Sequence, residues 1–421
     1  EISTLSDTRL KELAEYGFDD VEISQLRNAL FEIAKQTLEH YDEICEEDLR
    51  SLGQLTELRH ELRKHAPLAE TNVMKLYSYI DELLDSIKDH GTPQFTRQAR
   101  CAFMARSFCR TLVEKGYFTK QEMDDFMLSI PTVASEFERD FDLYSHGKLS
   151  RDDFNHLYGH LRLGTYDIRS DSYRNIYFDV ASANLTGNNK VKQEAKSLDL
   201  ERLQVALDEA GIPVTPEKFI EFIKKATQNR EYFKFEFTKS LSLMLDVIVK
   251  LGEVMAIARE DMSYLEIQDL LSYHSRDSYI QTIETRRRFY HVNSYLVLPE
   301  VIFDVGDIDV IDIDEARPNF ITNKVVEAPI VNLDEDHDSD ITGKIVVLTK
   351  ADPGYDWIFA KDIAGFVTKY GGAASHMAIR CAEFGIPAAI GCGEKIYQRI
   401  HRMQIMCLDC ENGRITEKQS Q

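Results

Sequence analysis

The sequence predicts a multidomain α and α/β protein, with a large all-α region followed by a C-terminal α/β domain. Three observations predict it: a helical apolar period through the first 300 residues, a β-rich composition after residue 288, and alternating strand and helix patterns near the C-terminus. A length of 421 residues suits two to three domains. We place an N-terminal helical segment, a second helical domain, a hinge or linker and the α/β domain at residues 1–90, 91–300, 301–319 and 320–421.

The first region shows helical signals throughout its length. Apolar residues in segment 30–41 recur every three or four positions, which is one face of an α-helix. Thr119 with Glu122, and Ser263 with Glu266, have the spacing of capping boxes, in which two side chains satisfy backbone N–H groups at a helix start. No repeat of fixed period is present in the sequence, so a helical solenoid is not predicted.

The C-terminal region reads differently, because short apolar runs replace the helical period. Two β-rich runs occupy residues 296–303 and 308–313. Further on, strands alternate with helices, which is typical of a compact α/β domain. The predicted strands are 344–348, 363–368 and 388–390, and the predicted helices are 352–361 and 375–384.

Composition and charge exclude several classes of partner. Hydrophobic residues make up 43% of the chain, yet no run approaches the roughly 18 apolar residues of a membrane span, so no membrane partner is predicted. The net charge is −22, and such a surface repels nucleic-acid phosphates, so no nucleic-acid partner is predicted either. Seven scattered cysteines form no disulfide framework and favour a cytoplasmic location. We interpret the one close pair, Cys407 and Cys410, as a coincidence of spacing.

The most informative segment joins the second predicted strand to the helix that follows it. Gly371 and Gly372 end the strand, and Ser375 and His376 begin the helix. A helix start offers unpaired N–H groups and a positive dipole end, and glycines allow the backbone to approach a ligand closely. A neutral imidazole is plentiful at pH 7 and can attack phosphorus. These residues fit an anion cradle with a nucleophilic histidine, although an ordinary polar helix cap would look the same.

Residues 371–391 resemble the phosphohistidine signature of the phosphoenolpyruvate-utilising enzymes, with both glycines, the Ser-His pair and Gly-Ile-Pro in register. The resemblance implies a swivelling phosphohistidine domain at the C-terminus. It also implies that His376 is the residue that accepts and passes on a phosphoryl group. Gly371, Gly372 and Ser375 would then bind the phosphate.

Two departures from that signature concern phosphate ligands. The family usually has threonine at Ala374 and a basic residue at Ala382. Arg380 is close in sequence to the second position, but two residues on a helix are about 200° apart, so we expect Arg380 to point to another face. The departures imply an altered geometry or a weakened activity.

The helical region carries its own resemblance to a branch of this family. Residues 158–168 and 230–239 are similar to the middle domain of rifampicin-phosphotransferase-like enzymes. In that branch the phosphohistidine domain ends the chain, whereas phosphoenolpyruvate synthase places a barrel after it. An ATP-grasp domain precedes the helical domain in the branch, and no glycine-rich phosphate loop occurs before residue 100 here. We therefore expect a piece of a longer chain, or a separate subunit that supplies the ATP-grasp domain.

Candidate acceptor-site residues lie in these two similar segments. They are His160, Arg162 and Asp167 around a glycine-containing break, and Arg230 and Lys234, which share a helix face four residues apart. Paired basic groups suit a phosphate or an acidic acceptor, and a base near the acceptor would be His160 or Asp167. Solvated helix surface explains the same residues without any function.

The resemblance implies a dikinase-type phosphotransferase. ATP and Mg²⁺, bound on the ATP-grasp domain, would supply the phosphoryl group to His376. A small-molecule acceptor on the helical domain would receive it, with AMP and phosphate as products, and the chain would be inactive without the ATP-binding domain. Two alternatives remain: phosphoenolpyruvate synthesis from pyruvate, and a partner-binding helical module that carries a relic phosphohistidine domain. No metal site is predicted in this chain.

Overall fold

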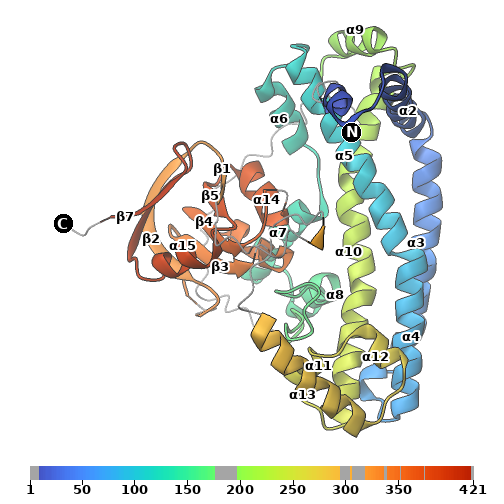
Figure 1. Cartoon of the computed structure of the whole chain (residues 1–421), viewed down its shortest axis with the longest axis vertical. Coiled ribbons are helices and arrows are strands. Elements are labelled where there is room, and N and C mark those ends of the chain that lie inside the picture. The colour runs from blue at the N-terminus through green and yellow to red at the C-terminus, as the bar shows by residue number, and fades with distance from the viewer. Residues whose placement is uncertain are drawn as a thin grey trace. The chain divides into compact units, whose positions relative to one another are not determined.

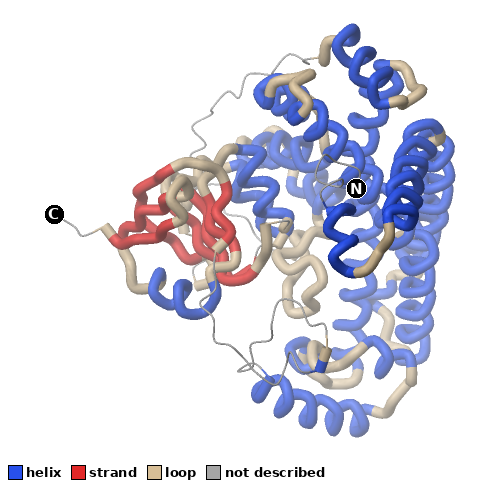
Figure 2. The backbone as a smooth tube through the Cα atoms, turned by 45° about the horizontal axis from the view of Figure 1, so that its top comes forward, coloured by secondary structure: helices blue, strands red, loops and turns tan. Residues whose placement is uncertain are grey.

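The fold was analysed in a computed structural model that describes residues 9–175, 197–293, 304–305, 318–335, 339–350, 352–373 and 375–418. It confirms the predicted class, because the helices precede a C-terminal domain that contains the strands (Figures 1 and 2). The two β-rich runs at 296–303 and 308–313 lie outside the described residues, as does most of the linker at 301–319. These segments stay predictions.

The chain divides into two compact units that alternate along the sequence. One unit comprises Glu1–Ala66, Glu82–Glu136 and Asn188–Leu241, and the other comprises Pro67–Asp81, Phe137–Gly187 and Ser242–Gln421. We call them unit 1 and unit 2. Helices α4 (Val73–His90) and α10 (Pro216–Val254) contribute residues to both.

Unit 1 is helical wherever the structure describes regular elements. Its core packs fully buried residues such as Phe126, Leu203 and Ile223, which come from three different helices. The helices α3 and α5 and the first part of α10 lie side by side within this unit (Figure 1). Besides parts of α4 and α10, its elements are η1 (Leu13–Tyr16), α2 (Asp20–Glu39), α3 (Tyr41–Lys64), α5 (Thr92–Glu114), α6 (Lys120–Leu128) and α9 (Leu200–Ala210), and α7 (Val133–Ser145) begins in it.

Helix starts follow the predicted capping pattern in one case and not in the other. The Glu122 N–H donates to the Thr119 hydroxyl at 3.2 Å, and the Thr119 N–H donates to the Glu122 carboxylate at 2.8 Å, which confirms that capping box. The predicted Ser263 box is wrong. The Ser263 hydroxyl instead donates to the Glu260 carbonyl at 2.6 Å, and Glu266 itself is the N-cap of the next helix, α12 (Ile267–Leu271).

Unit 2 combines short helices with a seven-stranded sheet. Its remaining helical elements are η2 (Pro67–Ala69), α8 (Arg151–Tyr158), α11 (Arg259–Met262), α13 (Arg276–Asn293), η5 (Pro353–Ala360), α14 (His376–Phe384) and α15 (Gly393–Ile400). The strands are β1 (Asn319–Ile321), β2 (Val325–Asn332), β3 (Ile345–Lys350), β4 (Gly365–Tyr370), β5 (Ala388–Ile390), β6 (Ile405–Asp409) and β7 (Arg414–Glu417). The strands predicted in residues 344–390 correspond to β3, β4 and β5. The predicted helix at 352–361 is the 3₁₀ helix η5.

The sheet has the strand order β1-β5-β4-β3-β2-β6-β7, and β2 to β5 run parallel. On one face, Val347 and Val367 pack with Tyr397 and Ile400 of α15. On the other, Phe366 contacts Phe359 of η5, and Phe359 stacks on Phe384 of α14. Helix α14 and η5 therefore cover one face of the parallel strands, and α15 covers the other.

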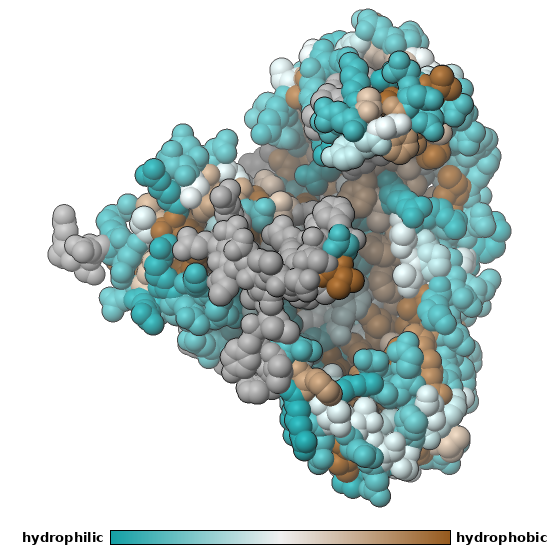
Figure 3. Space-filling view, in the orientation of Figure 1, coloured by the Kyte–Doolittle hydropathy of each residue, from teal (hydrophilic) through white to brown (hydrophobic). Residues whose placement is uncertain are grey.

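Hydrophilic side chains cover most of the described surface in Figure 3, as the large negative charge implies. Among the residues that the structure describes, no helix is long and apolar enough to cross a membrane. The seven cysteines are free thiols, and six are buried. Cys407 in β6 is the partly exposed one, whereas burial raises the pKa of Cys410 to about 11.

Candidate functional site

The predicted phosphate-binding residues Gly371, Gly372 and Ser375 lie in or beside the turn between β4 and α14. Gly371 has a φ of 133°, which L side chains rarely adopt, and the Ser375 N–H donates to the Gly372 carbonyl at 2.9 Å. Ser375 is the N-cap of α14, and its hydroxyl accepts from the Ala378 N–H at 3.3 Å. His376 is the first residue of the helix. It therefore lies where backbone N–H groups and the helix dipole favour an anion. Ala374 lies outside the described residues.

A third glycine, Gly391 after β5, allows this turn to form. Its φ is 76°, and a Cβ at this position would be 2.4 Å from the Gly371 carbonyl oxygen. The Gly391 N–H donates to the Thr368 hydroxyl of β4 at 3.2 Å, and the Cys392 N–H donates to the Thr368 carbonyl at 2.8 Å. The glycine after β5 thus lies directly against the Gly371 backbone.

We predict that Gly391→Ala destabilises the domain by about 2–4 kcal/mol, because the added Cβ overlaps a backbone oxygen and φ is positive. Thermal unfolding followed by circular dichroism measures the change. Gly53→Ala is the control, because a Cβ there meets nothing within 4 Å and the residue lies within α3. An unchanged melting temperature for Gly391→Ala would contradict the close approach of the two glycines.

The imidazole of His376 is held by a carboxylate that sequence reasoning missed. Its Nε2 is 2.7 and 2.8 Å from the two carboxylate oxygens of Asp356 in η5, and both side chains are largely buried. A carboxylate can only accept, so the Nε2–H of His376 donates to Asp356. The contact fixes the ring orientation and places the lone pair on Nδ1 in this arrangement. Asp356 precedes His376 by 20 residues, and no sequence spacing signals such a contact.

Arg380 also belongs to this site, in contrast to the sequence-based expectation. It lies four residues after His376, so both side chains share a face of α14. The guanidinium is buried, and its Nε is 3.9 Å from Oδ1 of Asp356. The sequence-based expectation compared Arg380 with position 382, two residues away. The spacing that matters is the four residues between His376 and Arg380, which places both side chains on one helix face.

Three carboxylates balance the buried charge of Arg380. Its guanidinium donates to Glu383 at 3.0 Å and to Glu138 of α7, and Asp356 is the third. Burial alone would lower the pKa of Arg380, but these neighbouring negative charges raise it overall, so the side chain stays cationic. The ring of Phe384 packs against the guanidinium at 4.5 Å.

The loop after α8 packs against η5 within unit 2. The Tyr173 hydroxyl donates to the Gly354 carbonyl, and burial together with the charges of Asp356 and Asp352 raises the pKa of Tyr173. Thr165 donates through its N–H and its hydroxyl to Asp352 at 3.2–3.4 Å. These contacts join the predicted acceptor segment to the η5 helix that holds Asp356.

The buried side chain of Arg162 stabilises this loop through several hydrogen bonds. It is 2% exposed, and it donates to the Ser242 hydroxyl and carbonyl at 3.1 Å, to the Ser170 carbonyl at 2.6 Å, and to Asp246. Its donors are therefore engaged by protein groups, as befits a residue that fixes the backbone. His160 is also buried, at 8% exposed.

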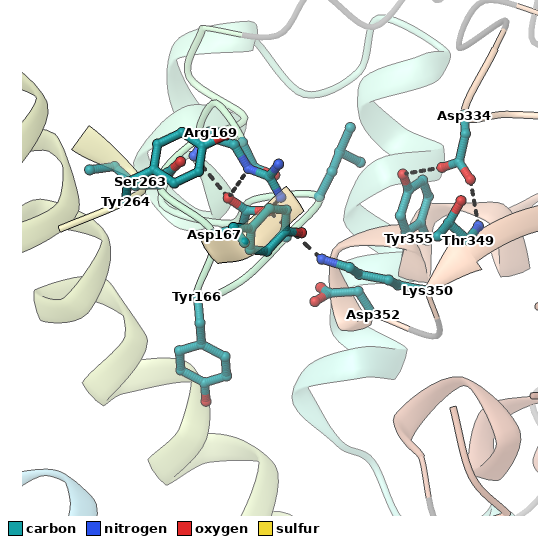
Figure 4. Close-up of a pocket in the computed structure, with 15 residues that line it drawn as sticks. Tyr166, Asp167, Arg169, Ser263, Tyr264, Asp334, Thr349, Lys350, Asp352 and Tyr355 are labelled. Carbon is teal, nitrogen blue, oxygen red and sulfur yellow. Dashed lines mark hydrogen bonds and ion pairs between the residues drawn. The ribbon is translucent and has the colours of Figure 1, made fainter. Parts of the chain in front are cut away.

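A cavity of about 570 Å³ lies beside the loop, and Asp167 lines it (Figure 4). Arg169 donates to Asp167 at 2.7 and 3.0 Å, and Lys350 of β3 lies 3.9 Å from the same carboxylate. The hydrogen bond from Arg169 lowers the pKa of Asp167. Further lining residues are Tyr166, Tyr264, Tyr290, Asp334, Asp352 and Tyr355.

The remaining predicted acceptor residues, Arg230 and Lys234, lie on the part of α10 that belongs to unit 1. Arg230 is 3.6 Å from Glu231 and packs over the ring of Phe103 at 5.5 Å. The structure thus places Asp167 and His376 in unit 2 and the Arg230–Lys234 pair in unit 1. An acceptor role for this pair stays a prediction.

Residues 341–413 match the sequence family described as PEP-utilising enzyme, mobile domain. The C-terminal α/β domain is a mobile domain of the PEP-utilising enzymes. The match spans β3 to the end of β6, and so contains His376, Asp356 and Arg380.

Two curated relatives extend the similarity beyond the mobile domain. Rifampicin phosphotransferase of Bacillus subtilis (strain 168) is 28% identical over 222 residues, which are 48% of this chain and 24% of the relative. Rifampicin phosphotransferase of Bacillus cereus is 26% identical over 212 residues, which are 46% of this chain and 24% of the relative. The matched part thus spans about a quarter of the length of each relative.

Proposed function

We propose that the chain is the phosphoryl-carrying and acceptor-binding part of a dikinase-type phosphotransferase. The carrier is His376, and the observation that supports this most strongly is its position at the start of α14, directly after the Gly371–Gly372 turn. The match to the mobile domain and the two phosphotransferase relatives support the same assignment. The amide groups of the first turn and Ser375 would stabilise the phosphoryl oxygens.

The proposed reaction has two transfers and one covalent intermediate. After water has taken the γ-phosphoryl group of ATP as phosphate, an imidazole nitrogen of His376 forms a bond to the β-phosphorus. The bond from that phosphorus to the bridging oxygen breaks, and AMP leaves. An acceptor oxygen then attacks the same phosphorus, the P–N bond breaks, and the acceptor proton passes to a base. The intermediate lets one carrier serve two separate sites.

We place the acceptor in the cavity beside residues 163–170. It is lined by the predicted segment around Asp167, by Asp352, which caps η5, and by Tyr355 of η5, the helix that also holds Asp356. Since the pKa of Asp167 is lowered, its carboxylate stays ionised and can orient an acceptor hydroxyl by accepting a hydrogen bond. The buried His160 is the less suitable base, because it does not line the cavity.

We assign ATP and Mg²⁺ to an ATP-grasp domain, in the same full-length chain or in a separate subunit. The ion would bridge and neutralise the phosphates during transfer to His376. Movement of the mobile domain about the linker at 301–319 would carry the phosphoryl group between the two sites. The cytoplasm is the compartment in which we expect this reaction.

Intact-mass spectrometry of the full-length protein tests the proposal. The protein is incubated with Mg²⁺ and either β-labelled ATP or labelled phosphoenolpyruvate, at alkaline pH because phosphohistidine is labile in acid. We expect one phosphoryl adduct from ATP, together with AMP and phosphate. Labelling from phosphoenolpyruvate, with pyruvate released, would favour the phosphoenolpyruvate synthase-type reaction instead. No adduct from either donor would contradict the carrier role and favour a relic domain.

A further inference from the structure

The strongest unexplained feature near the proposed carrier is a buried cation whose hydrogen-bonding capacity is incomplete. The Arg380 side chain is 9% exposed, and its Nε has no hydrogen-bond partner within the described structure. A buried N–H group without an acceptor is unfavourable, so it marks a place where an acceptor is expected. This Nε faces Oδ1 of Asp356 at 3.9 Å, beyond hydrogen-bond distance.

One carboxylate oxygen lies between the two functional side chains. Oδ1 of Asp356 is 2.7 Å from Nε2 of His376 and 3.9 Å from Nε of Arg380. Phosphorylation of Nε2 requires Asp356 to withdraw and the Nε2 proton to be replaced by one on Nδ1, so that the lone pair lies on Nε2. The phosphoryl group would then occupy the space that the Asp356 carboxylate fills, and its oxygens would come within reach of the guanidinium. The Asp356 carboxylate thus shows that the space between the His376 imidazole and the Arg380 guanidinium accommodates an anionic group.

We infer that Arg380 is the phosphoryl-binding cation of this site and that its guanidinium binds the oxygens of phospho-His376. This inference rests on the proposed carrier role of His376. In the unphosphorylated state, Asp356 holds the imidazole, and Glu138 and Glu383 hold the guanidinium. Arrival of a dianionic phosphoryl group repels Asp356, because two like charges cannot share one position, and Arg380 becomes its partner.

The arrangement accounts for one departure from the family signature. The basic residue that the family carries at position 382 is an alanine here, and Arg380 supplies the positive charge on the face of α14 that also carries His376. Guanidinium groups suit this task because their planar donor array matches phosphate oxygens. Glu138 belongs to α7, outside the mobile domain, so release of Glu138 would leave Arg380 free to bind the phosphoryl group more tightly.

The test uses chemical phosphorylation, which is independent of ATP. Phosphoramidate adds a phosphoryl group to histidine, and ³¹P NMR then follows the titration and the decay of the His376 signal, which is assigned by its loss in His376→Ala. In Arg380→Met we expect the phosphoryl pKa to rise by about one unit, because a nearby cation favours the dianion. We also expect the phosphohistidine to decay at least about threefold faster. Glu138→Gln should change both quantities in the opposite direction.

Arg399→Met is the matched control, because Arg399 lies on α15 and donates to the Ile415 carbonyl at 3.2 Å. If Arg380→Met fails to fold by circular dichroism, Arg380→Lys and Glu138→Gln give the answer, with a partial upward shift expected for the lysine. Identical titrations of the Arg380 and Arg399 variants would overturn the inference, as would a His376 that phosphoramidate leaves unmodified. Shifts as expected in a protein that ATP never labels would support Arg380 and refute only the proposed function.

Discussion

Replacement of His376 with alanine should abolish the phosphoryl adduct and reduce turnover by on the order of 10⁴-fold or more. The reason is that covalent transfer needs a nucleophilic nitrogen at this position, and the described neighbours Asp356 and Arg380 offer none. The substitution removes the hydrogen bond to the largely buried Asp356, but Arg380 still lies beside that carboxylate, so the melting temperature should fall by no more than about 5 °C. Intact-mass spectrometry and turnover assays on the full-length protein measure the first effect, and circular dichroism measures the second.

His401→Ala is the control for a histidine in the same domain. Its Nδ1 is 3.4 Å from Glu335, so it also lies beside a carboxylate, but it follows α15 and is distant from the Gly371 turn in sequence. This variant should form the phosphoryl adduct and turn over as the protein without substitutions does. Retention of the adduct in His376→Ala, or its loss in His401→Ala, would place the phosphoryl group on a different residue.

Gly354→Ala should separate η5 from the loop after α8. A Cβ at this position would be 1.8 Å from the Arg162 carbonyl oxygen and 2.4 Å from Cα of Leu163, and backbone atoms cannot yield as a flexible side chain does. The contacts of Thr165 with Asp352 and of Tyr173 with Gly354 should be lost together. We expect this substitution to make the packing of η5 on the loop less favourable by at least about 3 kcal/mol.

The single tryptophan of the chain reports on this separation. Trp357 lies in η5 and is 8% exposed, so its emission should shift to longer wavelength in Gly354→Ala. Amide hydrogen exchange in residues 162–165 should become faster at the same time. Gly53→Ala, in α3, should change neither observable. An unchanged emission spectrum and unchanged exchange in Gly354→Ala would show that η5 does not pack on the loop in solution.

Local sequence signals predicted the parts of the fold that depend on local physics. The parallel strands β3, β4 and β5 are short apolar runs between turn residues, and a buried strand needs little else to be recognised. The helix α14 ends at Gly385, in the left-handed conformation that glycine allows. By contrast, η5 was predicted only as a short helix, because its 3₁₀ geometry depends on packing as well as on Pro353 and Gly354.

Contacts between distant segments carried no such signal. The Asp356–His376 pair joins η5 to α14, and the Glu138–Arg380 pair joins α7 to α14 across 242 residues of sequence. A spacing rule reaches at most four or five residues, so it finds the shared face of His376 and Arg380 but not their carboxylates. Asp167 was selected for its polarity, and the cavity that it lines also includes Lys350 from a different segment.

The distribution of buried and exposed thiols in this fold allows a dye to be attached at one defined position. Six of the seven cysteines are buried, and Cys407, on the β6 strand of the mobile domain, is the one that is partly exposed. A maleimide dye should therefore attach at this position in preference to the others, without prior removal of native cysteines. A second dye on an introduced surface cysteine outside the mobile domain would form a donor–acceptor pair. Single-molecule energy transfer between the two dyes would then measure whether the mobile domain changes its distance from the rest of the chain when ATP is added, as the proposed function requires.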